Sequence, residues 1–195
     1  MDLIKEAKKL FQAYRKKHNP FPGPNYHYKF MFEYGKLRYE HKQDFNLDLY
    51  NISVWLHDIG RYTLLDKTGE TDSERDYHKV IGAKIFDDKF AHLIQNSKHK
   101  KIIRRCVLEH SGKIKFSNNF KTRHEEIQVI READKISFLH PVYINWLVKN
   151  NNKVLAKKFL KKNYDELKKL NPSQFALDVA NDWKMKSQKI IDKAS

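Results

Sequence analysis

Apolar residues recur every three or four positions along most of the chain, which is the spacing of a helix with one buried face. The first such run covers residues 2–17, and its apolar positions are Leu3, Ile4, Ala7, Leu10, Phe11 and Tyr14. Three prolines and a glycine between His18 and Asn25 are incompatible with a helix. The pattern therefore predicts an amphipathic helix over residues 2–17 that ends before His18.

The same spacing predicts helices along the rest of the chain. One helix is predicted to begin near Tyr26. The others are predicted over Leu47–Ile59, Asp76–Ala91, Lys98–Ser111, Arg123–Lys135, Tyr143–Val148, Asn152–Leu170 and Ser173–Lys193. Gly60 is expected to end one helix, and Ser173 is expected to cap another. Residues 65–73 are polar and are predicted to form a loop. Because no segment alternates apolar and polar residues, the predicted fold class is all-α, with no significant sheet and a single domain over residues 1–195.

Composition narrows the class of protein further. Of the 195 residues, 40% are hydrophobic and 13% aromatic, enough to form a core, so a disordered chain is excluded. Six glycines and five prolines are too few for a turn-rich sandwich or barrel. Mean hydropathy is −0.80, and no apolar run approaches the ~18 residues of a membrane span. Cys106 has no second cysteine to pair with and is expected to be buried. The charged N-terminus does not resemble a signal peptide, so we expect a cytoplasmic protein without membrane association.

The chain is strongly basic, with 39 Lys and Arg against 24 Asp and Glu and a net charge of +15. Such a charge attracts phosphate-bearing partners, including nucleic acid. Most of the excess is lysine scattered along the chain, which equally fits a compositional bias with lysines on solvated helix faces. Both interpretations stay open at this point.

Histidines and aspartates placed near predicted helix ends form the most informative pattern. They are His27, His57, Asp58, His78, His110 and Asp134. Mixed imidazole and carboxylate ligands suit a divalent cation such as Mn, Fe, Co, Ni, Zn or Mg, and the set contains no thiolate of a structural zinc site. Neighbouring residues on an ideal helix point about 100° apart, so His57 and Asp58 can serve one ion only where the helix ends.

This ordered set resembles the HD-domain metal-dependent phosphohydrolases. The string LHDIG at 56–60 is similar to the signature of that family, and READK at 131–135 is similar to its closing aspartate helix. His27 precedes His57 by thirty residues, and the resemblance covers about residues 26–137. It implies an HD-type helical bundle, with the helix in residues 1–25 and the helices of 141–195 packed onto this core.

The resemblance also implies metal ligands. His27, His57, Asp58 and Asp134 match the residues that hold one divalent ion in HD enzymes. His78 and His110 match the histidines that hold a second ion in two-metal members, where Asp58 bridges the two ions. Those members often have a His-His pair where this chain has His110 and Ser111. One ion is therefore expected, and a second is left open.

The implied activity is hydrolysis of a phosphate ester by a metal-activated water, with Asp58, Arg61 and Lys135 in catalytic roles. Arg61 and Lys135 are candidates for neutralising phosphate oxygens. The expected substrate is a nucleotide or a related small phosphomonoester or diester. Two alternatives remain: an HD-type nuclease that acts on nucleic acid, and a non-catalytic module that senses a metal or nucleotide.

Overall fold

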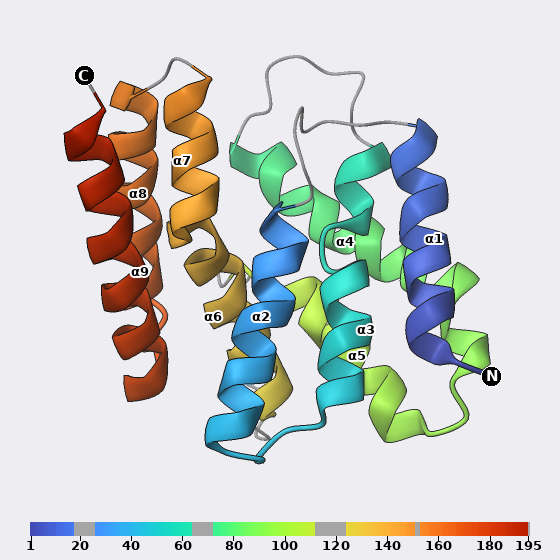
Figure 1. Cartoon of the computed structure of the whole chain (residues 1–195). Coiled ribbons are helices and arrows are strands. Elements are labelled where there is room, and N and C mark those ends of the chain that lie inside the picture. Colours follow the sequence, from blue (N-terminus) through green and yellow to red (C-terminus); the bar gives the residue numbers. More distant parts are fainter. Residues whose placement is uncertain (18–25, 64–71, 112–123, 151–152, 195) are drawn as a thin grey trace. The chain divides into compact units, whose positions relative to one another are not determined.

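A computed structural model describes residues 1–17, 26–63, 72–111, 124–150 and 153–194. Within these ranges the regular elements are helices and none is a strand (Figure 1), which confirms the all-α prediction. The α-helices are α1 (Leu3–Lys17), α2 (Tyr26–His41), α3 (Leu47–Leu56), α4 (Asp72–Lys89), α5 (Ser97–Glu109), α6 (Glu125–Ile136), α7 (Pro141–Lys149), α8 (Lys153–Lys168) and α9 (Gln174–Lys193). Short 3-10 helices are η1 (Ile59–Thr63), η2 (Ala91–Leu93) and η3 (Ser137–Leu139). No described helix is both long and apolar enough to cross a membrane.

The chain divides into two compact units that each combine two stretches of sequence. Unit 1 consists of residues 1–24 and 43–130, and unit 2 consists of residues 25–42 and 131–195. The division falls within α6, whose first half belongs to unit 1 and whose second half belongs to unit 2. The expectation of one domain over residues 1–195 stays a prediction.

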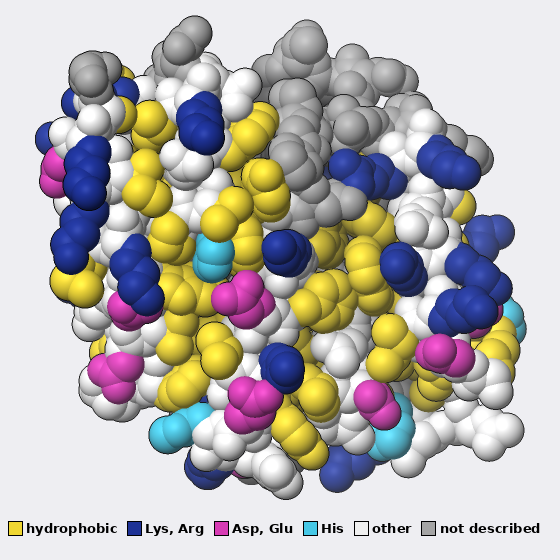
Figure 2. Space-filling view, in the orientation of Figure 1, with side chains coloured by type: hydrophobic (Ala, Val, Ile, Leu, Met, Phe, Trp, Pro, Cys, Tyr) yellow, Lys and Arg dark blue, Asp and Glu magenta, His cyan; other side chains and the backbone are white. Residues whose placement is uncertain are grey.

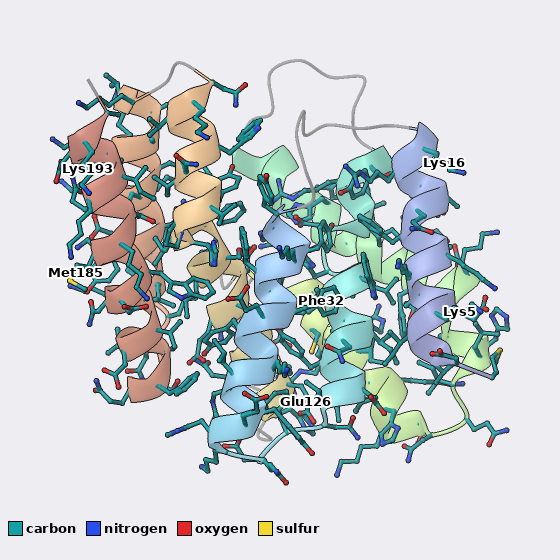
Figure 3. All side chains as sticks on the ribbon, viewed as in Figure 1. Lys5, Lys16, Phe32, Glu126, Met185 and Lys193 are labelled. Atoms are coloured by element: carbon teal, nitrogen blue, oxygen red, sulfur yellow. The ribbon has the colours of Figure 1, made fainter. Side chains whose placement is uncertain are left out.

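Unit 1 is built around α3 and α5, which pack against each other, with α1 on α3 and α4 on α5. The α1 helix is amphipathic as predicted: Phe11 is buried against Trp55, with ring centroids 5.3 Å apart, whereas Lys5 and Lys16 extend outward (Figure 3). Figure 2 shows the side chains of one face of the molecule coloured by type. Cys106 of α5 is fully buried, and burial raises the pKa of its thiol to about 12. The expectation that Cys106 is a buried residue is therefore confirmed.

Unit 2 surrounds the short helix η3, which contacts α2, α7, α8 and α9. Leu139 of η3 is fully buried, and its carbonyl oxygen accepts a 2.7 Å hydrogen bond from the Ser187 hydroxyl of α9. The carboxylate of Glu132 is also buried in this unit. It accepts hydrogen bonds from the Tyr34 hydroxyl at 2.6 Å and from the backbone N–H of Ser173 at 2.8 Å, which links α2, α6 and the start of α9.

Helix boundaries depart from the predicted ones at several ends. The α3 helix ends at Leu56 and not at Ile59, because the chain turns into η1 there. The α4 helix begins at Asp72, so residues 72–73 are helical and their assignment to a loop was wrong; residues 65–71 lie outside the described ranges. The cap of α9 was predicted correctly: the Ser173 hydroxyl accepts from the N–H of Ala176.

Gly60 lies in η1 where this short helix meets α4. A Cβ atom at Gly60 would stand 2.0 Å from the backbone oxygen of His78 and 2.6 Å from the backbone nitrogen of Gly82. Real Cβ atoms essentially never come this close to backbone atoms. Glycine is thus required here for space, because it lets the backbone that carries Asp58 lie directly against the helix that carries His78.

We predict that Gly60→Ala destabilises the protein by roughly 2–4 kcal/mol, because two backbone segments must move apart. Gly82→Ala is the matched control. Its Cβ would stand 3.0 Å from a side-chain methyl of Val107, which can shift, and alanine is the better helix former by about 1 kcal/mol. Urea unfolding at neutral pH measures both. Equal stabilities of the two variants would contradict the close approach at Gly60.

Candidate metal centre

Two candidate ligands, His57 and His110, occupy the same position at the ends of two helices. His57 is the C-terminal cap of α3, and His110 is the C-terminal cap of α5. Each backbone N–H donates to the carbonyl four residues earlier. Helix C-termini carry partial negative charge on their unpaired carbonyls, which favours a cation nearby. The prediction that the His57-Asp58 pair lies at a helix end is confirmed.

Both imidazoles are held in one tautomer by their own helices. The Nδ1 atom of His57 is 2.8 Å from the carbonyl oxygen of Val54, and Nδ1 of His110 is 2.9 Å from that of Val107. A carbonyl oxygen can only accept, so each Nδ1 carries the hydrogen. In a neutral ring Nε2 is then the atom with the lone pair, and a metal would bind there. Both rings are buried, which holds this orientation.

The carboxylate of Asp58 meets two imidazoles inside unit 1. Its Oδ1 atom lies 3.1 Å from Nε2 of His78 and 3.3 Å from Nε2 of His110, and the two Nε2 atoms are 3.3 Å apart. All three side chains are buried. They form a group of potential ligand atoms within reach of a single ion.

These separations match the spacing of ligands around one metal. Donor atoms about 2.1 Å from an ion, at angles of about 90–110°, stand about 3.0–3.4 Å from one another. With its hydrogen on Nδ1, neutral His110 directs a lone pair toward the Asp58 carboxylate, which is repulsive unless a proton or a cation lies between them. A hydrogen on Nε2 of His78 can be donated either to Asp58 or to His110, but not fully to both. A cation at the centre satisfies all three atoms, so the donor set fits a divalent ion.

The ionisation states also suit a metal. Burial by itself raises the pKa of Asp58, but the nearby Arg61 and His57 are the largest of the influences that outweigh it and hold the pKa well below its ordinary value. Burial lowers the pKa of His110 to about 4, although Asp58 acts in the opposite direction. At neutral pH the carboxylate is therefore charged and the His110 imidazole is neutral, which are the forms that coordinate cations.

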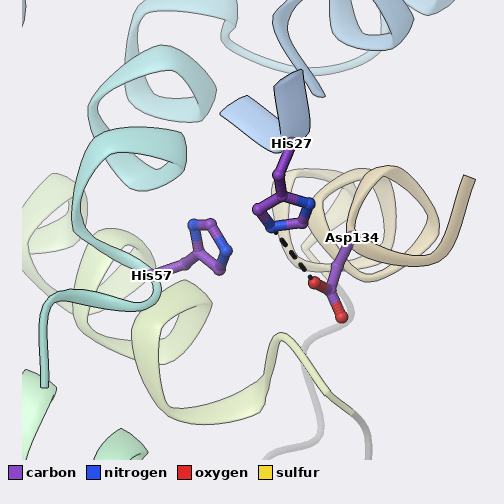
Figure 4. A group of neighbouring side chains, drawn as sticks. All are labelled: His27, His57 and Asp134. Carbon is purple, nitrogen blue, oxygen red and sulfur yellow. Dashed lines mark ion pairs between the residues drawn. The ribbon is translucent and has the colours of Figure 1, made fainter. Parts of the chain in front are cut away.

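Unit 2 holds the two other predicted ligands, His27 at the start of α2 and Asp134 near the end of α6. Nε2 of His27 lies 3.5 Å from Oδ1 of Asp134 (Figure 4, which also draws His57 of unit 1). The Ser137 hydroxyl donates to the carbonyl of Asp134 at 3.0 Å, so it accepts from Nδ1 of His27 at 2.8 Å. His27 is thus fixed in the same tautomer as His57, and its ring stacks on Phe138 with centroids 4.4 Å apart.

The two predicted phosphate-binding cations both contact candidate ligands. Nε of Arg61 lies 2.7 Å from Oδ1 of Asp58. Nζ of Lys135 lies 3.0 Å from Asp134 and 3.2 Å from Glu166 of α8. Burial by itself lowers the pKa of Lys135, but the two carboxylates outweigh it and raise the pKa. Lys135 is therefore charged and held between two acids, and the phosphate-binding roles of both cations stay predictions.

The structure brings the predicted residues together in two sets. Asp58, His78 and His110 meet in unit 1, where His57 lies 3.5 Å from Asp58, and His27 meets Asp134 in unit 2. Sequence reasoning missed Ser137 and Glu166. Ser137 follows Asp134 by three residues, a helical spacing that could have indicated their contact. Glu166 could not be found in this way, because only the packing of α8 within unit 2 brings it to Lys135.

Comparison with protein-family models, with curated proteins and with solved structures finds no match to this chain. The relation to HD-domain enzymes therefore stays an inference from the residues themselves.

We predict that purified, tag-free protein binds Mn²⁺, Co²⁺ or Zn²⁺, and that Asp58→Asn and His110→Gln each lower the affinity at least tenfold, because each removes one donor from a buried set of three. Isothermal titration calorimetry on metal-stripped protein gives the affinity and the number of ions. His92→Ala, an exposed histidine in η2, is the control and should bind as the wild type does. Unchanged binding in both Asp58 and His110 variants, with the fold intact by circular dichroism, contradicts the assignment.

Proposed function

We propose that the protein is a metal-dependent phosphohydrolase that acts on a phosphate ester. The observation that carries the proposal is the buried group of Asp58, His78 and His110, whose donor atoms have the mutual spacing of ligands around one ion. The support from sequence is the order of six ligand-type residues that resembles HD-domain enzymes. A nucleotide or a related small phosphomonoester or diester is the proposed substrate.

The residues of this chain would hold a divalent ion through imidazole nitrogens and carboxylate oxygens. When bound, such an ion lowers the pKa of its water to about 7 and draws charge from a phosphoryl oxygen. The protein contributes the imidazoles of His57 and His110, whose Nδ1 hydrogens are already donated to backbone carbonyls, so these rings need little reorientation to bind an ion. Burial of Asp58, His78 and His110 limits the access of bulk water, which strengthens electrostatic interactions at the site.

The resemblance assigns His27, His57, Asp58 and Asp134 to one ion. Asp58 would bridge to a second ion held by His78 and His110. This assignment draws ligands from both units, and we propose it on the order of the residues in the sequence. The tautomers of His27 and His57 agree with this assignment. Because Nδ1 of each ring donates a hydrogen bond, Nε2 is the atom that would bind the ion.

Arg61 is proposed to act on the substrate as well as on Asp58. Its Nε contacts the carboxylate, while the guanidinium also carries two terminal nitrogens suited to phosphate oxygens. About a quarter of its side chain is exposed, so it differs from the buried ligands beside it. Lys135 is proposed to keep Asp134 ionised and oriented, through the contact that Glu166 completes.

We expect metal-loaded protein to hydrolyse p-nitrophenyl phosphate, its bis ester or a nucleotide in the presence of at least one of Mn²⁺, Co²⁺, Ni²⁺, Zn²⁺ and Mg²⁺. Asp58→Asn should lower kcat/KM by roughly 100-fold or more, because it weakens the metal set itself. Arg61→Ala should lower kcat/KM while leaving the bound-metal stoichiometry unchanged. Released phosphate or nitrophenol measures turnover.

The matched control for this experiment is His92→Ala, which should retain full activity. A protein that binds metal stoichiometrically and yet hydrolyses none of these esters with any of the five ions would contradict the proposal. Such a result would favour a metal-binding module that senses a ligand without turnover.

A further inference from the structure

Helix α8 lies outside the part of the chain that resembles HD-domain enzymes, yet it packs against the short helix η3, which directly follows α6. Phe159 of α8 contacts Phe138 of η3, with ring centroids 5.3 Å apart. Phe138 in turn stacks on the imidazole of His27, with centroids 4.4 Å apart. One aromatic residue therefore connects α8 to a candidate metal ligand of unit 2.

A second connection from α8 is ionic and leads to Asp134. Glu166 follows Phe159 by seven residues, about two turns along the same side of the helix. Its Oε2 atom lies 3.2 Å from Nζ of Lys135, and the same Nζ lies 3.0 Å from Oδ2 of Asp134. The side chains of Lys135 and Asp134 are only 13% and 8% exposed. Water screens this pair less than a surface ion pair, so the charge of Lys135 has a strong effect on Asp134.

The two oxygens of the Asp134 carboxylate have different neighbours. Oδ2 contacts Lys135, whereas Oδ1 faces Nε2 of His27 at 3.5 Å (Figure 4). The ammonium thus fixes the orientation of the carboxylate and directs Oδ1 to the side where the imidazole lone pair lies. Its positive charge also opposes a divalent cation at that side, because like charges repel.

Glu166 offsets this opposing charge. Lys135 and Asp134 alone form a neutral pair, whereas the addition of the Glu166 carboxylate gives the group a net negative charge. Both carboxylates also draw on the same ammonium, so neither has it to itself. The other ion-pair partner of Glu166 within the described residues is Lys162, at 4.0 Å. Lys162 is 59% exposed and contributes little by comparison.

We propose that Glu166 is a positioning residue of the metal centre, which shares the ammonium of Lys135 with Asp134 and so keeps Asp134 available to a divalent ion. Without the Glu166 carboxylate, Lys135 pairs with Asp134 alone, and an ion has to compete with a complete lysine–carboxylate pair. This inference rests on the proposed role of Asp134 as a metal ligand. It gives the helices after residue 141 a function at the site as well as in the core.

The test measures the affinity of the whole chain for Co²⁺ by isothermal titration calorimetry, with the metal alone as the probe. Glu166→Gln removes the charge and nearly keeps the shape. We expect it to bind Co²⁺ about tenfold more weakly, the lower end of the loss typical for residues that hold a metal ligand in place. Asp182→Asn is the matched control, because it removes one carboxylate from an ion pair with Lys186 in the same unit and should bind as the wild type does.

A second pair of variants separates an effect through Lys135 from a direct effect of charge. In a Lys135→Met background, Glu166→Gln should change the affinity by less than about twofold, because no ammonium is left to share. A tenfold loss in both backgrounds overturns the proposal, as does wild-type affinity of Glu166→Gln. Glu166→Asp keeps the charge and should recover most of the affinity, and a loss equal to that of Glu166→Gln contradicts the charge argument.

The same titration distinguishes failure of this inference from failure of the proposed function. A wild-type chain that binds no Co²⁺ overturns both, because no metal centre is then present. A wild-type chain that binds Co²⁺, together with equal binding by Glu166→Gln, overturns only the role of Glu166.

Discussion

A buried carboxylate must be compensated, and unit 1 is organised around that requirement at Asp58. Taking a charged group out of water is unfavourable by several kcal/mol unless partners replace the lost hydration. Here the partners are a guanidinium and three imidazoles, contributed by three helices and the 3-10 turn after α3. Two of these imidazoles are constrained by backbone carbonyls to present lone pairs. The arrangement is therefore poor as an ordinary salt bridge and well suited to a cation.

The backbone around this carboxylate is shaped by the same requirement. The helix before it ends early at Leu56, which lets His57 and Asp58 face one region in spite of their adjacency in sequence. Gly60 then lets the turn approach α4 closely enough for His78 to reach the carboxylate. His110 repeats the cap geometry of His57 at the end of α5. The C-terminal ends of two helices, which carry partial negative charge, therefore each place an imidazole beside the Asp58 carboxylate.

Much of this could be predicted from the sequence, and the failures have physical causes. The helical class follows from apolar spacing, and the ligand types follow from His57, Asp58 and the other members of the set. The end of α3 was placed three residues late because local propensity cannot register the approach of η1 to α4. Glu166 was missed as a partner of Lys135 because it lies on α8, 31 residues later in the sequence, and only tertiary packing brings the two side chains together.

The central claim is that Asp58, His78 and His110 coordinate one divalent cation. Anomalous diffraction from crystals of the protein loaded with Mn²⁺ or Zn²⁺ tests this most directly, because it locates the ion independently of any activity. The account predicts an anomalous peak about 2.0–2.3 Å from a carboxylate oxygen of Asp58 and from Nε2 of both histidines. A peak elsewhere, with these three side chains still in direct contact with one another at full metal loading, would contradict it.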